Sequence, residues 1–265
     1  MLLHTSNTFI NYNHKLKEAD IIFIGIRFSG RALNSCSYYG STIVRESLKL
    51  TEDSERLFEK LKICDVGDIE PGTSFETMSS QIRDTIEEIK NQNSKAMLCL
   101  IGGDHSITLP VIEALKPKTI VQFDAHADMR SEFLGDRYMQ QTWAYHAAQK
   151  CKIIQVGVRA QSREEIENAK NLNVVQMNPE EFIRISKNIQ NPVHITLDMD
   201  VFDPCYVETG LPEPDGLTPK QVLECLQKIN PDSIDIVEIS DNRLPSKTGA
   251  LAAACLERMW NSERS

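Results

Sequence analysis

Two carboxylates and an imidazole alternate with alanines in the segment "DAHAD" at residues 124–128. Asp124, His126 and Asp128 all carry good metal ligands, and they directly follow the apolar run 119–123. One interpretation is a polar strand end that leads into a loop. Residues i and i+2 of an extended chain point to the same side, however. If the chain stays extended, these three side chains can face one point, and the segment forms one edge of a metal site.

Two further polar clusters follow apolar runs elsewhere in the sequence. The run 96–102 is followed closely by His105, and the run 193–199 contains Asp198, with Asp200 just behind it. The spacing of two again allows Asp198 and Asp200 to face one point if the backbone is extended. Each cluster lies at the carboxyl end of a predicted strand. Parallel neighbouring strands would bring these ends to one rim of a sheet, which is where ligands bind in folds of this class.

These six side chains comprise four carboxylates and two imidazoles, with no thiolate among them. Several buried carboxylates on one rim would repel one another and would be costly to desolvate. Divalent cations remove that problem, and four negative charges balance two of them. Oxygen and nitrogen ligands of this kind suit manganese, iron or magnesium better than structural zinc. A pair of metal ions about 3.5–4 Å apart is a known hydrolytic arrangement.

The elements that must position these residues are short apolar strands alternating with amphipathic helices. Strands are predicted at 20–26, 62–66, 96–102, 119–123, 152–158, 173–177, 193–199 and 233–239. Helices are predicted at 74–92, 106–115, 218–229 and 247–260, with Ser74 or Thr77 as the cap of the first. Several strands are apolar almost throughout, as expected of parallel strands that are covered on both faces. The alternation predicts an α/β fold with helices on both sides of a parallel sheet.

Composition is consistent with one globular domain over residues 1–265, with 41% hydrophobic and 25% charged residues. No stretch approaches the ~18 apolar residues of a membrane span, and the N-terminus does not resemble a signal peptide. Seven scattered cysteines without a C-x-x-C pair favour reduced thiols in a cytoplasm. The net charge of −9 and the lack of a basic stripe argue against nucleic acid as a partner. Nucleotide-binding, serine-hydrolase and zinc-protease motifs are missing.

In this order, "GGDHS" at 102–106, "DAHAD" at 124–128 and "LDMDVFDP" at 197–204 resemble the ureohydrolase family of arginase and agmatinase. "LPEPDGLT" at 211–218 is similar to the proline-rich loop of that family, and "DIVEIS" at 235–240 to its late strand bearing a glutamate. The resemblance implies a three-layer α/β/α sandwich on a mostly parallel eight-stranded sheet. It also implies a homo-oligomer, a trimer or hexamer.

The resemblance further implies two manganese ions in each subunit. One would be bound, or bridged to the other, by His105, Asp124, Asp128 and Asp198. The second site and the bridges would be completed by Asp124, His126, Asp198 and Asp200. A water activated there would attack the carbon of a guanidinium group, releasing urea and an amine. Asp128 would hold this water and pass its proton to the leaving amine. Glu238 would pair with the planar guanidinium cation through two hydrogen bonds.

The loop 129–142 resembles agmatinase-like members more than arginases, so a small cationic guanidino substrate, agmatine, is preferred. The alternatives are an arginase or another guanidino-acid hydrolase. The loop departs from the family at Gln140, which stands where the family has a substrate-contacting histidine. Glutamine forms hydrogen bonds but cannot titrate near neutrality. A catalytically impaired metal-binding paralogue is therefore a third hypothesis. His146 is either a displaced substitute or, as we favour, a helix-surface or packed histidine.

Overall fold

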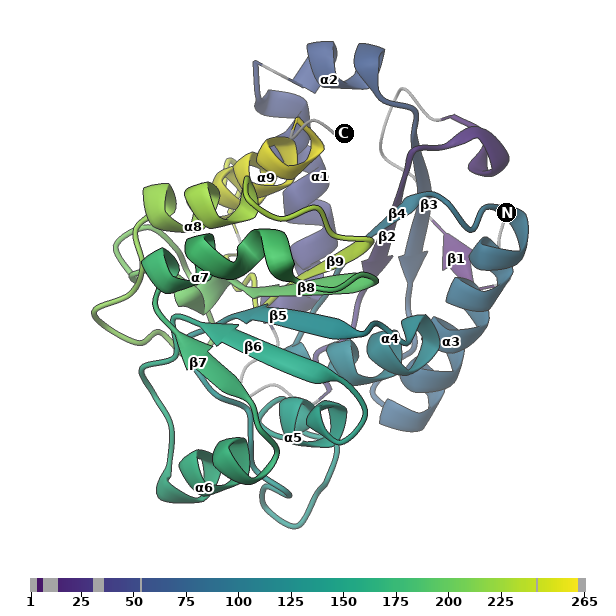
Figure 1. Cartoon of the computed structure of the whole chain (residues 1–265). Helices are drawn as coiled ribbons and strands as arrows, with labels where there is room; N and C mark the ends of the chain where they lie inside the picture. Colours follow the sequence, from purple (N-terminus) through teal and green to yellow (C-terminus); the bar gives the residue numbers. More distant parts are fainter. Residues whose placement is uncertain (1–3, 7–13, 31–35, 53, 242, 262–265) are drawn as a thin grey trace.

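A nine-stranded sheet runs through the centre of the computed structural model (Figure 1). The structure describes residues 4–6, 14–30, 36–52, 54–241 and 243–261, so most of the N-terminal stretch considered above lies outside it. The strands lie in the order β1-β3-β2-β4-β9-β8-β5-β6-β7. Their bounds are β1 Thr5–Ser6, β2 Ile21–Ile26, β3 Ile63–Ile69, β4 Met97–Ile101, β5 Thr119–Phe123, β6 Lys152–Val156, β7 Val175–Met177, β8 Val193–Asp198 and β9 Ser233–Val237.

The predicted fold class is confirmed. Strands β2 to β9 are the eight predicted strands, with ends that differ by at most three residues, and all their pairings are parallel. The short strand β1 was not predicted, and it pairs antiparallel with β3 at the sheet edge. Two polar residues offer no apolar periodicity from which a strand can be predicted.

Helices cover both faces of the sheet, which gives the three layers. On one face lie α1 Gly40–Leu50, α2 Ser54–Lys60, α7 Pro179–Ile185, α8 Pro219–Leu226 and α9 Lys247–Trp260. On the other lie α3 Phe75–Gln92, α4 Thr108–Leu115, α5 Trp143–Ala148 and α6 Arg163–Asn171. The four predicted helices are confirmed as α3, α4, α8 and α9. Ser74 caps α3 by accepting a hydrogen bond from the Thr77 backbone N–H.

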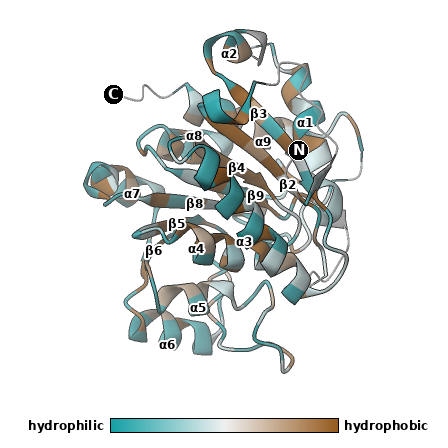
Figure 2. Cartoon of the chain, turned by 90° about the vertical axis from the view of Figure 1, so that its right-hand side faces the viewer, coloured by the Kyte–Doolittle hydropathy of each residue, from teal (hydrophilic) through white to brown (hydrophobic). Residues whose placement is uncertain are grey.

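Alternating side chains of the inner strands feed two separate cores. Phe23 of β2 packs with the α1 and α9 face, whereas its neighbour Ile22 packs with the α3 face. The hydrophobic strands therefore lie between helices whose outer surfaces are polar (Figure 2). Among the described helices, none is both long and apolar enough to cross a bilayer.

A buried ion cluster joins α1 to β3. The Arg45 guanidinium, which has no exposed surface, donates from Nε and Nη2 to the Asp65 carboxylate at 2.9 and 2.8 Å and also contacts Asp68. Asp68 also forms an ion pair with Arg27, whose Nε lies 2.8 Å from Asp68 Oδ2. Two carboxylates buried at this depth need such cationic partners, so Arg45 ties the first helix to the sheet.

Candidate metal centre

The four neighbouring strands β4, β9, β8 and β5 deliver their carboxyl ends to one rim of the sheet. The predicted metal ligands and Glu238 all follow or end these strands: His105 after β4, Asp124, His126 and Asp128 after β5, Asp198 and Asp200 at the end of β8, and Glu238 after β9. Parallel topology is the physical reason, because it sends every carboxyl end in the same direction.

His105 Nδ1 faces three carboxylates at once. It lies 3.2 Å from Asp124 Oδ2, 3.2 Å from Asp128 Oδ2 and 3.0 Å from Asp198 Oδ2. The imidazole is buried, and within the described part of the chain Nδ1 has no hydrogen-bond partner of acceptable geometry. A buried nitrogen without a partner, surrounded by acceptors, is the arrangement expected where a cation completes the site.

A second group forms around His126. Its Nδ1 lies 2.8 Å from Asp200 Oδ2 and 3.7 Å from Asp124 Oδ1, and its Nε2 lies 3.5 Å from Glu213 Oε1. One group of potential metal ligands comprises His105, Asp124 and Asp128, and another comprises Asp124, His126 and Asp200. Asp124 belongs to both, as expected of a carboxylate between two cations.

The backbone reaches this arrangement by turning, not by staying extended. β5 ends at Phe123, and Asp128 adopts a left-handed conformation with φ of 53°. Asp200 lies in the 3-10 helix η5 (Met199–Val201). The extended backbone with alternating side chains that the sequence suggested therefore does not continue beyond the strand ends. The carboxylates are instead held by backbone N–H donors, such as Ala125 N to Asp200 Oδ1 at 3.0 Å.

Backbone amides also fix the other carboxylates of the rim. His126 N donates to Asp124 Oδ1 at 2.6 Å, and Asp200 N donates to Asp198 Oδ1 at 2.8 Å. Gln122, on β5, adds a side-chain hydrogen bond from Nε2 to Asp124 Oδ2 at 2.8 Å. These carboxylates are thus oriented before any ligand arrives.

The charges of the rim are unbalanced without a cation. Burial and the charges of Asp200 and Asp128 raise the pKa of Asp124 to about 7. Burial, Asp200 and Asp124 likewise raise the pKa of Asp198. Burial works against an ionised Asp200, but its hydrogen bond from His126 outweighs that effect and lowers its pKa. Neighbouring carboxylates that resist ionisation are the electrostatic pattern that divalent cations relieve.

Burial alone would lower the pKa of the His105 and His126 imidazoles. In both residues the surrounding carboxylates have the larger effect and raise the pKa. The hydrogen bond and charge of Asp200 raise the pKa of His126 to about 11. Asp124, Asp128 and Asp198 raise the pKa of His105 well above its usual value. The donor set, the unpartnered nitrogen and the crowded carboxylates together fit a site for two divalent cations.

Glu238 and Gln140 share a small cavity of about 30 Å³ with this rim. The cavity is lined by His105, His126, Asp128, Gln140, Gln141, Asp198, Asp200, Leu211 and Glu238. Glu238 follows β9 directly, with φ of 60°, and its Oε1 accepts a hydrogen bond from His105 N at 3.0 Å. Burial and the charge of Asp104 raise the pKa of Glu238 to about 8. Gln140 is buried, and its Oε1 has no hydrogen-bond partner among the residues that the structure describes.

Trp143 is a site residue that sequence reasoning missed. Its indole Nε1 donates to Asp128 Oδ2 at 2.8 Å, and its ring centroid lies 4.8 Å from that of His105. In the sequence this tryptophan belongs to an ordinary helix start. A tryptophan that follows a polar loop was the only available signal, and it is a weak one.

His146, in α5, does not line the cavity. It contacts the rings of Tyr138 and Tyr145, consistent with the helix-surface or packed histidine that we favoured.

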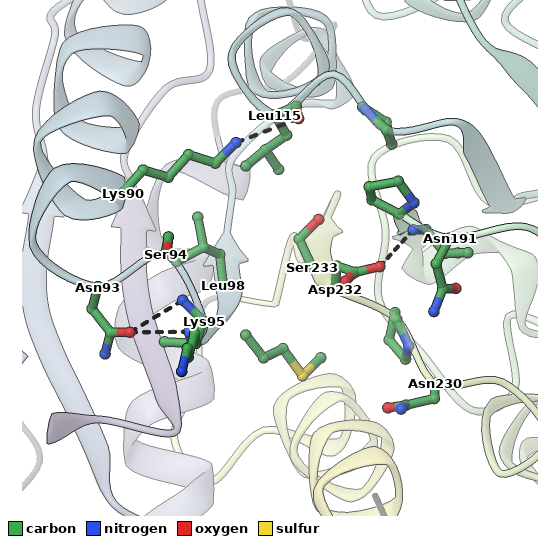
Figure 3. A pocket seen from close by; sticks show the side chains of 16 residues that line it. Lys90, Asn93, Ser94, Lys95, Leu98, Leu115, Asn191, Asn230, Asp232 and Ser233 are labelled. Carbon is green, nitrogen blue, oxygen red and sulfur yellow. Dashed lines mark hydrogen bonds between the residues drawn. The ribbon is translucent and has the colours of Figure 1, made fainter. Parts of the chain in front are cut away.

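A larger cavity of about 290 Å³ lies at the opposite, amino-terminal ends of β4, β8 and β9 (Figure 3). Its lining includes Lys90, Lys95 and Ser233, and it contains none of the predicted site residues.

A family profile described as "Arginase family" matches residues 19–260. The chain belongs to the arginase family. It is 32% identical over 257 residues to the agmatinase of Pyrococcus horikoshii, with 91% of each chain covered. It is 31% identical over 258 residues to the N(1)-aminopropylagmatine ureohydrolase of Thermococcus kodakarensis, which covers 91% of this chain and 89% of that protein.

Solved structures agree with the arginase-family assignment. The agmatine ureohydrolase of Thermoplasma volcanium superposes with a TM-score of 0.87 at 25% identity, covering 99% of this chain and 94% of that one. The predicted resemblance is thus confirmed. As an arginase-family ureohydrolase, the protein is a hydrolytic enzyme that acts on guanidino compounds.

Proposed function

We propose that this arginase-family enzyme is a binuclear manganese hydrolase that converts agmatine and water into putrescine and urea. The observation that carries the proposal is the pair of potential ligand groups that share Asp124, with Asp198 3.0 Å from His105 Nδ1 and Glu238 at the same cavity. The proposed ligands are His105, Asp124, His126, Asp128, Asp198 and Asp200. When bound, two Mn²⁺ ions would neutralise the carboxylates and supply an acidic, nucleophilic water.

The residues of the chain then have separate roles. Glu238 would hold the guanidinium group by accepting its N–H donors, in a geometry that a planar cation favours. A substrate cation beside Glu238 also offsets the burial that raises the pKa of this carboxyl. Asp128 would receive the proton of the attacking water and deliver it to the departing amine. One C–O bond forms, and the bond between the guanidinium carbon and the substituted nitrogen breaks.

The lining of the cavity favours agmatine over an α-amino acid. Among the described residues that line it there are carboxylates, imidazoles, two glutamines and a leucine, but no lysine or arginine. The described lining therefore offers a substrate carboxylate no lysine or arginine to pair with, and its own carboxylates, such as Asp128 and Glu238, would repel it. Agmatine has no carboxylate and carries positive charge at both ends. An arginase or another guanidino-acid hydrolase is therefore the second candidate.

Gln140 would act as a substrate-binding residue. Its buried Oε1 without a partner lies at the same cavity as Glu238 and can accept a substrate N–H. The presence of Glu238 beside the proposed ligands speaks against an impaired metal-binding paralogue, because such a protein would have no use for a buried carboxylate that binds substrate. We further propose one domain over residues 1–265, a homo-oligomeric assembly (trimer or hexamer) and a cytoplasmic location, on the strength of the family resemblance and the cysteine pattern.

Urea release from a panel of guanidines tests the proposal. The Mn²⁺-loaded protein is incubated with agmatine, arginine, guanidinobutyrate and N(1)-aminopropylagmatine, and we expect the highest kcat/KM with agmatine. Glu238→Gln should abolish most of this activity, whereas Glu113→Gln on the outer surface of α4 is the matched control and should not. Urea from none of the panel would refute the function. A clear preference for arginine would refute the substrate.

A further inference from the structure

A buried chain of hydrogen-bonding side chains runs from His105 into the sheet. His105 Nε2 lies 2.9 Å from Thr196 Oγ1, and Thr196 Oγ1 lies 3.4 Å from Thr108 Oγ1. Thr108 Oγ1 donates to Asp235 Oδ2 at 3.0 Å, and His194 Nε2 lies 2.9 Å from that same oxygen. All five side chains are buried, with exposed fractions of 1% or less. They come from the 3-10 helix η3 (His105–Ile107), α4, β8 and β9, so separate segments of the sequence meet here.

This series of hydrogen bonds has a direction because Asp235, at its inner end, can only accept hydrogen bonds. A carboxylate has no proton to give, so Asp235 Oδ2 accepts from both Thr108 and His194. The single hydroxyl proton of Thr108 is then committed to Asp235, and toward Thr196 the Thr108 oxygen can only accept. Thr196 therefore donates to Thr108, and its oxygen is left to accept from His105 Nε2.

The same reasoning fixes which nitrogen of His105, at the outer end of the series, carries the proton. His105 Nε2 must carry a proton, which places the free lone pair of the neutral imidazole on Nδ1. Nδ1 is the nitrogen that faces Asp124, Asp128 and Asp198. Without this chain, the tautomer of the ring would not be fixed, and the tautomer protonated on Nδ1 cannot bind a cation there.

We propose that Thr196, Thr108 and Asp235 are positioning residues that fix the Nε2–H tautomer of His105 and so raise the affinity of the rim for Mn²⁺. His194 supports the inner end: Nε2 bonds to Asp235, and Nδ1 lies 2.8 Å from Ser233 Oγ. The inference rests on the proposed metal site, although it concerns how the site is organised and not which substrate it takes.

The first measurement is the dissociation constant for Mn²⁺, by competition with a fluorescent chelator, with bound Mn²⁺ counted per chain. Thr196→Val removes the acceptor at nearly constant volume and should weaken Mn²⁺ binding by about 10- to 100-fold. Thr196→Ser keeps the hydroxyl and should restore affinity to within about threefold of wild type. The matched control is Thr85→Val in α3, another buried threonine, whose Oγ1 has no hydrogen-bond partner; its affinity should equal wild type.

Asp235→Asn is the sharpest variant because it keeps the shape of the side chain while adding an N–H donor. The amide can direct its N–H toward Thr108 and so reverse the direction of the chain. We expect about tenfold weaker Mn²⁺ binding. Nitrogen-15 spectra of the six histidines in wild-type protein loaded with diamagnetic Zn²⁺ should show His105 protonated at Nε2.

A wild-type His105 protonated at Nδ1 would overturn the proposal, whether or not every variant folds. So would unchanged Mn²⁺ affinity in folded Thr196→Val and Asp235→Asn proteins. None of these measurements requires turnover. If Mn²⁺ binds as expected but no guanidine yields urea, the proposed activity fails and this inference stands. If the wild-type protein binds no Mn²⁺, the metal site fails and the inference fails with it.

Discussion

Trp143→Phe tests how Asp128 is held for proton transfer. The indole N–H donates to Asp128 Oδ2 at 2.8 Å, in a buried position where Trp143 is only 1% exposed. Asp128 also stands in a left-handed backbone conformation, with φ of 53°. Phenylalanine keeps an aromatic ring beside His105 but removes the donor. The carboxylate then loses a fixed partner just where its direction matters.

The expected loss can be worked out from the type of hydrogen bond. A hydrogen bond to a charged group contributes about 1.5–3 kcal/mol. If this contribution is realised mainly in the transition state, kcat falls by about 10- to 150-fold. KM for agmatine should change little, because in the proposed mechanism Asp128 acts on the water and the leaving amine, whereas Glu238 holds the guanidinium group.

The assay is steady-state urea release with saturating Mn²⁺, so that altered metal affinity does not enter. Trp260→Phe in α9 is the matched control. It makes the same chemical change at the only other tryptophan, which is 6% exposed and whose Nε1 has no hydrogen-bond partner. A Trp143→Phe enzyme with kcat within about twofold of wild type would refute the reasoning, as would a loss seen entirely in KM.

Three further predictions concern the proton path, the buried charges and the ion cluster. Gln140→His should raise kcat by at least about tenfold if the position lacks a proton shuttle; unchanged or lower urea release would count against that view. In metal-free protein, raised pKa values of Asp124, about 7, and Glu238, about 8, mean that these carboxyls bind protons more tightly when folded. The free energy of unfolding of the metal-free protein should therefore fall as pH rises from about 4 to 8. Added Mn²⁺ should raise the Tm more at pH 8 than at pH 5 in thermal denaturation. An equal increase at the two pH values would contradict this. Arg45→Leu should lower the free energy of unfolding by about 3–5 kcal/mol in urea titrations, whereas Lys49→Ala, in an exposed pair, should cost under about 1 kcal/mol; similar losses would be a contrary result.

The sheet and the location of the rim could be predicted because both follow from local patterns. Apolar runs of five to seven residues identify the parallel strands. Parallel topology then sends the residues after each run to the same edge. His105, Asp124 and Asp198 needed no knowledge of pairing order to be placed together. The order itself, with β4 and β9 between β2 and β8, has no equivalent signal in the sequence.

What escaped prediction depends on contacts between segments distant in sequence. Trp143 reaches Asp128 from the next helix, and Asp235 lies 41 positions from its partner His194. The left-handed backbone at Asp128 and Glu238 is unusual for residues other than glycine, so an extended chain was the default expectation. At Asp128 and at Glu238 the preference for extended backbone is overridden, because surrounding contacts hold a conformation that the isolated segment would avoid.

The positions of Gln140 and Trp143 connect two of the predictions. Both adjoin Asp128: Gln140 lines the same cavity, and Trp143 donates to its carboxylate. Because Gln140 cannot titrate near neutrality, the proposed proton transfer would depend on a well-oriented Asp128. A histidine at position 140 would supply a second proton carrier, so the penalty of Trp143→Phe should shrink in the Gln140→His background. We expect a coupling of about 0.5–3 kcal/mol in a double-mutant cycle on kcat. Strictly additive effects would mean that the two residues act on different steps, and that Asp128 does not carry the proton.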